Sequence, residues 1–212
     1  MMADLSLPPD YFARQDPSPD EVFYKVPRKV VHIDDHAVQA VRQLFSELLP
    51  SQGVYLDLMS SWRSHLPGEL KPSHVIGLGM NAEEMLDNPQ LDAHIVHNLN
   101  REPSLPFDDN SFDAAICTVS VQYLTQPIVV FQEVRRVLKP GALFVVSFSN
   151  RCFPSKAVAI WLNSSSRQHI ELVSGYFEQA GGWSDIQHRA VEGQSSLFRR
   201  PDPLYSVWAT KS

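Results

Sequence analysis

The feature of this sequence that most narrows the choice of folds is a predicted strand, helix and strand in direct succession. An apolar run covers residues 114–119, helically spaced apolar residues follow over residues 127–138, and a second apolar run covers residues 143–148. Pro127 stands at the expected start of the helix and Lys-Pro-Gly at residues 139–141 follows its end, which are usual places for these residues. Strands joined through a helix lie parallel with a right-handed crossover, so this segment predicts a parallel sheet covered by helices.

Apolar patterns elsewhere predict more elements of the same two kinds. We expect strands at residues 54–58, 74–78, 93–97, 183–190 and 204–209, and helices at residues 37–49, 82–86, 156–162 and 168–177. Because the last two strands have no helix between them, they are expected to pair as an antiparallel hairpin. The sequence therefore predicts one α/β domain over residues 1–212, with a mostly parallel seven-stranded sheet, helices on both faces and a C-terminal antiparallel hairpin.

The first 30 residues differ from the rest of the chain in composition. Prolines at positions 8, 9, 17, 19 and 27 exclude a continuous helix or a central strand, because proline lacks the backbone N–H and fixes φ. Four aromatic residues, Tyr11, Phe12, Phe23 and Tyr24, indicate that this segment packs against the domain. We therefore predict an N-terminal arm (residues 1–30) that covers either a binding site or core.

Composition excludes several classes of protein. Hydrophobic residues make up 43% of the chain and charged residues 20%, as in ordinary globular proteins, and the apolar runs are too short to span a bilayer. The net charge is -6 with no concentrated basic stretch, which argues against a nucleic-acid partner. The two cysteines and eight histidines lack the spacing of metal ligands. We expect a cytoplasmic protein with no membrane, nucleic-acid or metal partner.

Short motifs around the predicted strand-helix-strand unit are informative about the family. Leu-Pro-Phe occupies residues 105–107, Phe-Asp residues 112–113 and Arg-Val-Leu-Lys-Pro-Gly residues 136–141. In order and spacing these motifs resemble class I S-adenosylmethionine-dependent methyltransferases of the small-molecule type, over residues 54–148. The resemblance implies a Rossmann-like methyltransferase fold, S-adenosyl-L-methionine as cofactor and a small-molecule methyl acceptor. In such sheets ligands bind beyond the carboxyl ends of the strands.

In this family the first strand ends in an acidic residue, and the first cofactor loop, which follows it, contains alternating glycines. Asp57 keeps the acid, whereas Met59, Ser61 and Arg63 stand at the glycine positions. A side chain with a Cβ restricts positive φ and narrows the approach of a ligand to the backbone. Neighbouring serine hydroxyls could replace some backbone donors, while Trp62 could stack over a ligand or plug the site.

The second and third cofactor loops also depart from the family pattern. Gly79 stands where the second strand normally ends in an acid that holds the ribose hydroxyls, and Asn81 lies two residues further on. After the third strand, Asn98 or Asn100 could accept the hydrogen bond of the adenine amino group in place of the usual aspartate. The cofactor motif is therefore degenerate in all three loops, although the fold motifs are kept.

The resemblance assigns a set of candidate site residues. The candidate cofactor-binding residues are Asp57, Met59, Ser60, Ser61, Gly79, Met80, Asn81, Asn98, Leu99, Asn100 and Ser120. The candidate substrate-binding residues are Trp62, Arg63, Tyr123, Asn150 and Arg151. No residue is assigned as catalytic, because methyl transfer depends chiefly on holding donor and acceptor in line.

Each assignment has a structural alternative. Asp57 could instead cap the loop at Ser60 and Ser61, and Tyr123 could be an aromatic residue at the edge of the core. For the whole protein, the alternative to a methyltransferase is a catalytically inactive binding or scaffold protein that keeps the fold. A third hypothesis is a protein that binds a nucleotide-like ligand for other chemistry or for sensing.

Overall fold

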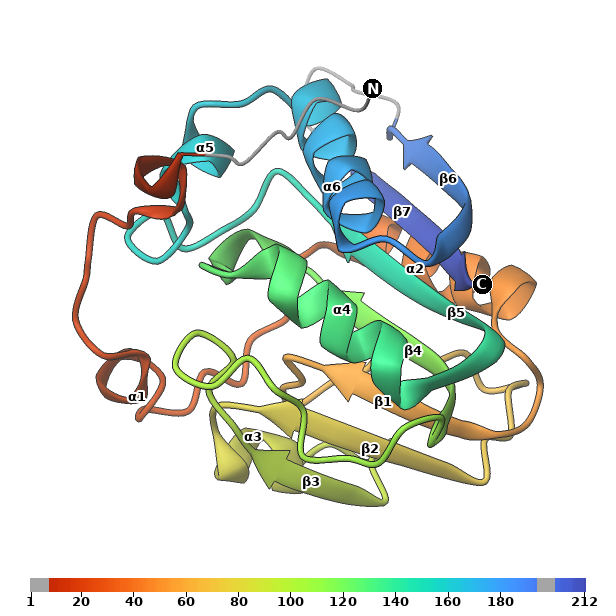
Figure 1. Ribbon diagram of the computed structural model, residues 1–212. Helices are drawn as coiled ribbons and strands as arrows, with labels where there is room; N and C mark the ends of the chain where they lie inside the picture. The colour runs from red at the N-terminus through yellow and green to blue at the C-terminus, as the bar shows by residue number, and fades with distance from the viewer. Residues whose placement is uncertain (1–7, 194–200) are drawn as a thin grey trace.

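Seven strands form one sheet in the order β3-β2-β1-β4-β5-β7-β6 in the computed structural model, which describes residues 8–193 and 201–212 (Figure 1). The strands are β1 (Val54–Leu58), β2 (His74–Gly79), β3 (Ala93–Val96), β4 (Phe112–Thr118), β5 (Leu138–Phe148), β6 (Trp183–Val191) and β7 (Leu204–Lys211). The first five run parallel, and β7 is antiparallel to both β5 and β6. The predicted fold class, including the C-terminal hairpin, is confirmed.

Helices cover both faces of this sheet. The longer ones are α2 (Asp35–Leu48), α4 (Pro127–Val137) and α6 (Ser166–Ala180), and the short ones are η1 (Pro9–Phe12), α1 (Asp20–Phe23), α3 (Ala82–Leu86), η2 (Val121–Tyr123) and α5 (Ala159–Leu162). Their starts follow from local capping: the Asp34 carboxylate accepts from the N–H of Ala37, and Ser165 and Gln168 form a capping box. Figure 1 shows α4 and α6 in front of the sheet and α2 behind it.

Alternate residues of the central strands belong to two separate cores. On β4, Ala115 and Cys117 join the core under α4 and α6, whereas Ala114 and Ile116 join the core under α2. All four residues are at most 1% exposed, so β4 is buried on both faces, as expected for a central parallel strand. Removal of this much apolar surface from water is the main stabilisation of the sheet.

The starts of two elements differ from the sequence prediction by three or more residues. Strand β5 begins at Leu138 rather than at residue 143, because the chain leaves α4 directly into the strand and the pairing with β4 is irregular at this end. Helix α5 begins at Ala159 rather than at residue 156. The residue before it, Val158, is extended and forms an isolated β-bridge with Arg14. Backbone that the pattern assigned to the helix is therefore paired with the arm.

The N-terminal arm, of which residues 8–30 are described, runs outside the sheet at the left of Figure 1. Its described part contains only η1 and α1, in agreement with its proline content.

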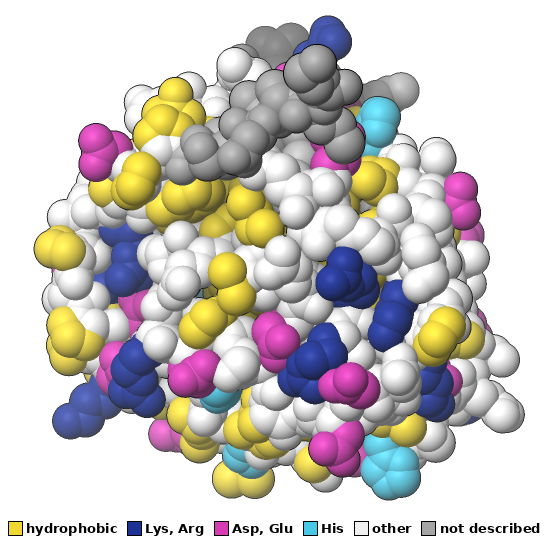
Figure 2. Space-filling view, in the orientation of Figure 1, with side chains coloured by type: hydrophobic (Ala, Val, Ile, Leu, Met, Phe, Trp, Pro, Cys, Tyr) yellow, Lys and Arg dark blue, Asp and Glu magenta, His cyan; other side chains and the backbone are white. Residues whose placement is uncertain are grey.

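Hydrophobic side chains are visible at the left edge of Figure 2, and charged side chains of both signs are interspersed over the rest of that face. Among the described residues, no helix is long and apolar enough to cross a membrane.

Candidate functional site

A cavity of about 300 Å³ lies at the carboxyl ends of the parallel strands. It is lined by the loops after β1, β2, β3, β4 and β5 and, on the remaining side, by the N-terminal arm and the residues that follow it. All the candidate cofactor residues predicted from the sequence line this cavity, and so do Trp62, Arg63, Tyr123 and Arg151. Asn150 is absent from the lining. The geometry therefore brings the predicted residues together, while their role in binding stays a prediction.

Asp57 is buried beneath the loop that follows β1. Its residue surface is 3% exposed, and its Oδ2 accepts hydrogen bonds from the hydroxyls of Ser60 and Ser64, both at 2.6 Å. Burial raises the pKa of Asp57 to about 6, and the two serine hydroxyls act in the opposite direction because they stabilise the carboxylate. The carboxyl group thus holds the loop together, as its structural alternative predicted, while lining the cavity.

The buried Asp57 makes the stability of the folded chain depend on pH. Its folded-state pKa is about 6 against an ordinary value of 3.8, so between these values the folded protein binds the proton more tightly than the unfolded chain. The contribution of Asp57 to stability therefore falls as the pH rises from about 4 to about 6 and stays low above that range. We expect Asp57→Asn to gain stability over the wild type by on the order of 2 kcal/mol between about pH 4 and pH 7.

Urea unfolding of both proteins across this pH range measures the effect. Asp108→Asn, which changes an exposed carboxylate outside the cavity lining, is the control and should show no such trend. A free-energy difference between wild type and Asp57→Asn that is constant from pH 4 to pH 7 would contradict the expected burial of the charge.

Non-glycine residues adopt left-handed backbone conformations around the cavity. Met59, at a position where the family has glycine, has a φ of 57°, and Val119 after β4 has a φ of 47°. This conformation is unfavourable for residues with a Cβ, and especially for a β-branched one. Each conformation is held by a backbone hydrogen bond. The N–H of Ser60, next to Met59, donates to Leu78 O, and the N–H of Val119 itself donates to Ser147 O. Such strain is concentrated at functional sites in many proteins.

Gly79 ends β2 directly below the loop of Asp57. A Cβ at this position would lie 2.2 Å from the carbonyl oxygen of Ser60, so no side chain fits here. Asn81, two residues further on, caps α3 by accepting from the N–H of Glu84 at 3.0 Å, and its Nδ2 donates to the carbonyl of Tyr24 at 2.8 Å. The missing ribose acid is therefore explained by the position of the first loop, and the nearby amide is engaged by the arm.

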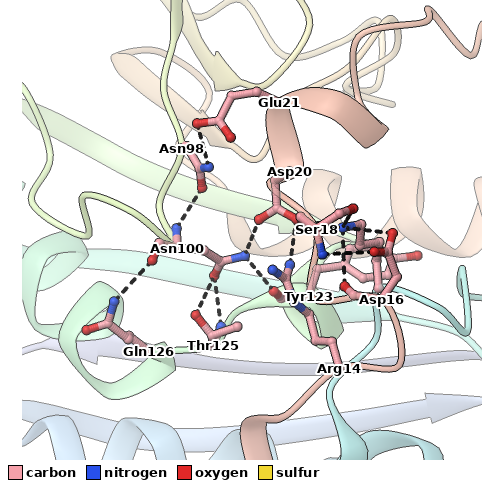
Figure 3. A network of polar contacts seen from close by, with 11 residues as sticks. Arg14, Asp16, Ser18, Asp20, Glu21, Asn98, Asn100, Tyr123, Thr125 and Gln126 are labelled. Atoms are coloured by element: carbon pink, nitrogen blue, oxygen red, sulfur yellow. Dashed lines mark hydrogen bonds and ion pairs between the residues drawn. The ribbon is translucent and has the colours of Figure 1, made fainter.

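The amides after β3 are also bonded to the arm (Figure 3). Asn98 Nδ2 donates to Glu21 Oε1 at 3.0 Å, and Asn100 Nδ2 donates to Asp20 Oδ2 at 2.9 Å and to the carbonyl of Tyr123 at 3.0 Å. The oxygen of Asn100 accepts from both the N–H and the hydroxyl of Thr125. Asn100 thus has a full set of partners and joins the arm to the loop after β4.

A buried lysine, which the sequence reasoning did not single out, fixes the arm. Lys156 is 0% exposed, and its Nζ lies 3.0 Å from Asp16 Oδ2, 2.7 Å from the carbonyl of Ser18 and 3.6 Å from Asp20 Oδ1. Asp20 is also paired with Arg14 at 2.6 Å. Lysine is rarely buried without partners, and this cluster joins the arm to the loop after β5.

The arm also supplies cavity residues that the sequence did not assign to the site. These are Asp20, Tyr24, Arg28 and Val30, followed by Val31 and His32, and they face Cys152 and Phe153 from the loop after β5. Trp62 is bonded to this wall because its Nε1 donates to the carbonyl of Val30 at 2.9 Å. The aromatic residues of the arm were the one signal for this wall available in the sequence.

Among the described residues, no group of three potential metal-binding side chains occurs.

Comparisons with known proteins agree with this architecture. Residues 69–146 match the methyltransferase domain family. A stretch of 71 residues is 37% identical to the biotin biosynthesis bifunctional protein BioHC of Teredinibacter turnerae, and it covers 34% of this chain and 12% of that protein. The chain is therefore comparable to only a small part of this curated relative.

Solved structures share the fold over most of the chain at low identity. An S-adenosylmethionine-dependent methyltransferase from Thermotoga maritima has a TM-score of 0.57 and 16% identity, covering 83% of this chain and 89% of its own. One from Methanosarcina mazei has a TM-score of 0.52 and 17% identity, covering 79% and 96%. The cyclase SpnF has a TM-score of 0.59 and 15% identity, covering 90% and 91%. Residues 69–146 thus match methyltransferase domains, and most of the chain shares the Rossmann-like fold of these solved structures.

Proposed function

We propose that this protein is a methyltransferase that binds S-adenosyl-L-methionine in the cavity and transfers its methyl group to a small-molecule acceptor. The observation that carries the proposal is the convergence of loops from β1 to β5 on one cavity lined by every candidate cofactor residue. The match of residues 69–146 to methyltransferase domains supports the same activity.

The residues present are compatible with this cofactor. The volume of about 300 Å³ is at the lower end of the range for small-molecule sites. Thr118 lines the cavity and its buried hydroxyl oxygen has no hydrogen-bond partner in the described part of the chain, so a polar partner is missing there. The loops at residues 57–61 and 79–81 would hold the cofactor from two sides.

The chemistry divides between cofactor and protein. When bound, S-adenosylmethionine supplies a methyl group made electrophilic by its sulfonium. The protein must hold the acceptor in line with that methyl group and exclude water, and neither task requires an assigned acid or base. The arm contributes to the second task because it closes one side of the cavity.

Isothermal titration calorimetry with S-adenosylmethionine and S-adenosylhomocysteine tests the proposal. We expect saturable binding of both, and we expect Asp57→Ala to weaken it by about tenfold or more, because it removes the group that fixes the first loop. Asp108→Ala, at an exposed site outside the lining, should bind as the wild type does. Absence of binding at millimolar ligand would overturn the assignment.

A second candidate is a non-catalytic binding protein that retains the fold. The observation that favours it is the engagement of Asn81, Asn98 and Asn100 by the arm, which uses the amides otherwise available to a cofactor. This candidate predicts no binding of either cofactor form by calorimetry, and it predicts that a protein partner is recovered by affinity capture in its place.

A further inference from the structure

One part of the cavity is distinct from the three cofactor loops. The arm and the residues that follow it contribute Tyr24, Arg28 and His32 to this part, and the segments after β4 and β5 contribute Tyr123 and Phe153. The ring centroid of Phe153 lies 5.3 Å from that of His32 and 6.1 Å from that of Tyr123, and the ring planes of Phe153 and Tyr123 make an angle of 27°. The guanidinium of Arg28 lies 5.6 Å from the same centroid. A wall of this kind suits a flat ligand.

Several hydrogen-bond donors on this wall have no acceptor among the described residues. The oxygen of Tyr123 accepts from the N–H of Phe153 at 2.8 Å, which leaves its own proton to be donated. In the described part of the chain, the hydroxyl of Tyr24 has no hydrogen bond. Arg28 donates through Nη1 to the carbonyls of Phe23 and Val26, while its Nε and Nη2 make no hydrogen bond to described residues.

Both phenols remain protonated at neutral pH. Burial raises the pKa of Tyr24, and the nearby Tyr123 and Asp20 raise it further. Burial also raises the pKa of Tyr123 to about 12. The two hydroxyls therefore act as hydrogen-bond donors, and both tyrosines line the cavity.

The carboxylates on the same walls already have partners. Asp20 is paired with Arg14 at 2.6 Å and with Asn100 at 2.9 Å. Glu84 accepts from the N–H of Arg28 at 2.5 Å and from the hydroxyl of Ser61 at 2.6 Å. The carboxylates therefore do not serve as acceptors for the unpaired donors of Tyr24, Tyr123 and Arg28. A ligand with acceptor oxygens would pair with these donors.

We propose that the methyl acceptor is a flat molecule carrying a carboxylate, which Tyr24, Tyr123 and Arg28 bind while its planar part lies against Phe153. A carboxylate matches the donors because it only accepts hydrogen bonds and can take two from a guanidinium. This inference rests on the proposed methyltransferase function and adds the class of the acceptor.

The test compares carboxylic acids with their neutral amides on the full chain saturated with S-adenosylhomocysteine. Benzoate and benzamide, cinnamate and cinnamamide, and nicotinate and nicotinamide are the three pairs, titrated by calorimetry. We expect the acid of at least one pair to bind about tenfold more tightly than its amide, the usual value of a charge-assisted hydrogen bond. Tyr24→Phe and Tyr123→Phe should each reduce this preference severalfold, because a carboxylate loses more than an amide carbonyl does when a donor is removed.

Tyr11→Phe is the matched control, because Tyr11 is an exposed tyrosine of the same arm outside the cavity lining. It should retain the preference for the acid. Tyr24→Phe is the more decisive variant, since its hydroxyl has no partner in the described chain and its removal should leave thermal unfolding unchanged. If S-adenosylhomocysteine fails to bind, the proposed function is wrong. If it binds but no acid is preferred, or the tyrosine variants keep the preference, the inference on the acceptor is overturned.

Discussion

Gly79→Ala is expected to destabilise the protein by more than about 3 kcal/mol and to abolish binding in the cavity. The new Cβ would lie 2.2 Å from the carbonyl oxygen of Ser60 and 3.1 Å from its carbonyl carbon. That loop cannot easily yield, because the N–H of Ser60 donates to Leu78 O at 2.9 Å and its hydroxyl to Asp57 at 2.6 Å. Gly79 is not one of the described glycines that have a positive φ. The expected destabilisation therefore comes from the steric clash and not from backbone conformation.

Two other glycines provide a graded control. Gly68→Ala adds a methyl group with nothing within 4 Å and should change the free energy of unfolding by less than about 0.5 kcal/mol. At Gly77 the methyl group would meet the end of the Leu91 side chain at 2.5 Å, which can rotate away, so about 1 kcal/mol is expected. Urea unfolding of the three variants ranks them. A Gly79→Ala variant no less stable than Gly77→Ala would show that the loop after β1 is adaptable.

Lys156→Met is expected to cost about 3 kcal/mol or slightly more, the lower end of the range for breaking a buried ion pair. Its ammonium has no exposed surface and lies 3.0 Å from Asp16 and 3.6 Å from Asp20. In the variant, the buried Asp20, which is 4% exposed in the wild type, retains Arg14 as its cationic partner. This remaining ion pair limits the loss of stability. Methionine fills a similar volume, so the change isolates the charge and its hydrogen bonds.

Two measurements separate loss of the whole fold from release of the arm. Urea unfolding gives the global free energy, and amide hydrogen exchange reports the non-proline residues of 14–30 individually. We expect exchange to accelerate most in the arm, because the cluster of Lys156 joins only the arm to the loop after β5. Lys29→Met removes an exposed lysine paired with Glu83 and Asp87 and should cost at most about 1 kcal/mol. Equal losses in both variants would mean that Lys156 is not the main attachment.

The sheet was predictable from the sequence because its strands are short apolar runs between clear turns. The predicted strand at residues 54–58 matches β1, and the predicted strand at 74–78 matches β2 to within one residue. The meeting of the candidate loops followed from the parallel topology alone. The start of β5 was predicted too late because Lys139 and Pro140 have the composition of a loop, although the structure places them in the strand.

The role of the arm was not predictable from local pattern. Its proline content forecasts irregular structure, but contacts such as Glu21 with Asn98 join residues 77 positions apart in sequence. Likewise, nothing in the sequence distinguishes Lys156 from an exposed lysine, because burial of a charge is decided by tertiary partners. The reason for Gly79 also lies in another segment, since the space for its side chain is taken by the backbone of Ser60.

The division of the cavity between sheet and arm has a consequence for how such a protein can diverge. Residues 69–146, which match the family, contain the loops after β2, β3 and β4, whereas Tyr24, Arg28 and Phe153 lie outside that segment. Only Phe12 of residues 8–30 packs against the two hydrophobic cores. Substitutions of arm residues outside the Lys156 cluster therefore alter ligand preference at little cost to folding, and specificity can diverge between gene copies while the sheet stays unchanged.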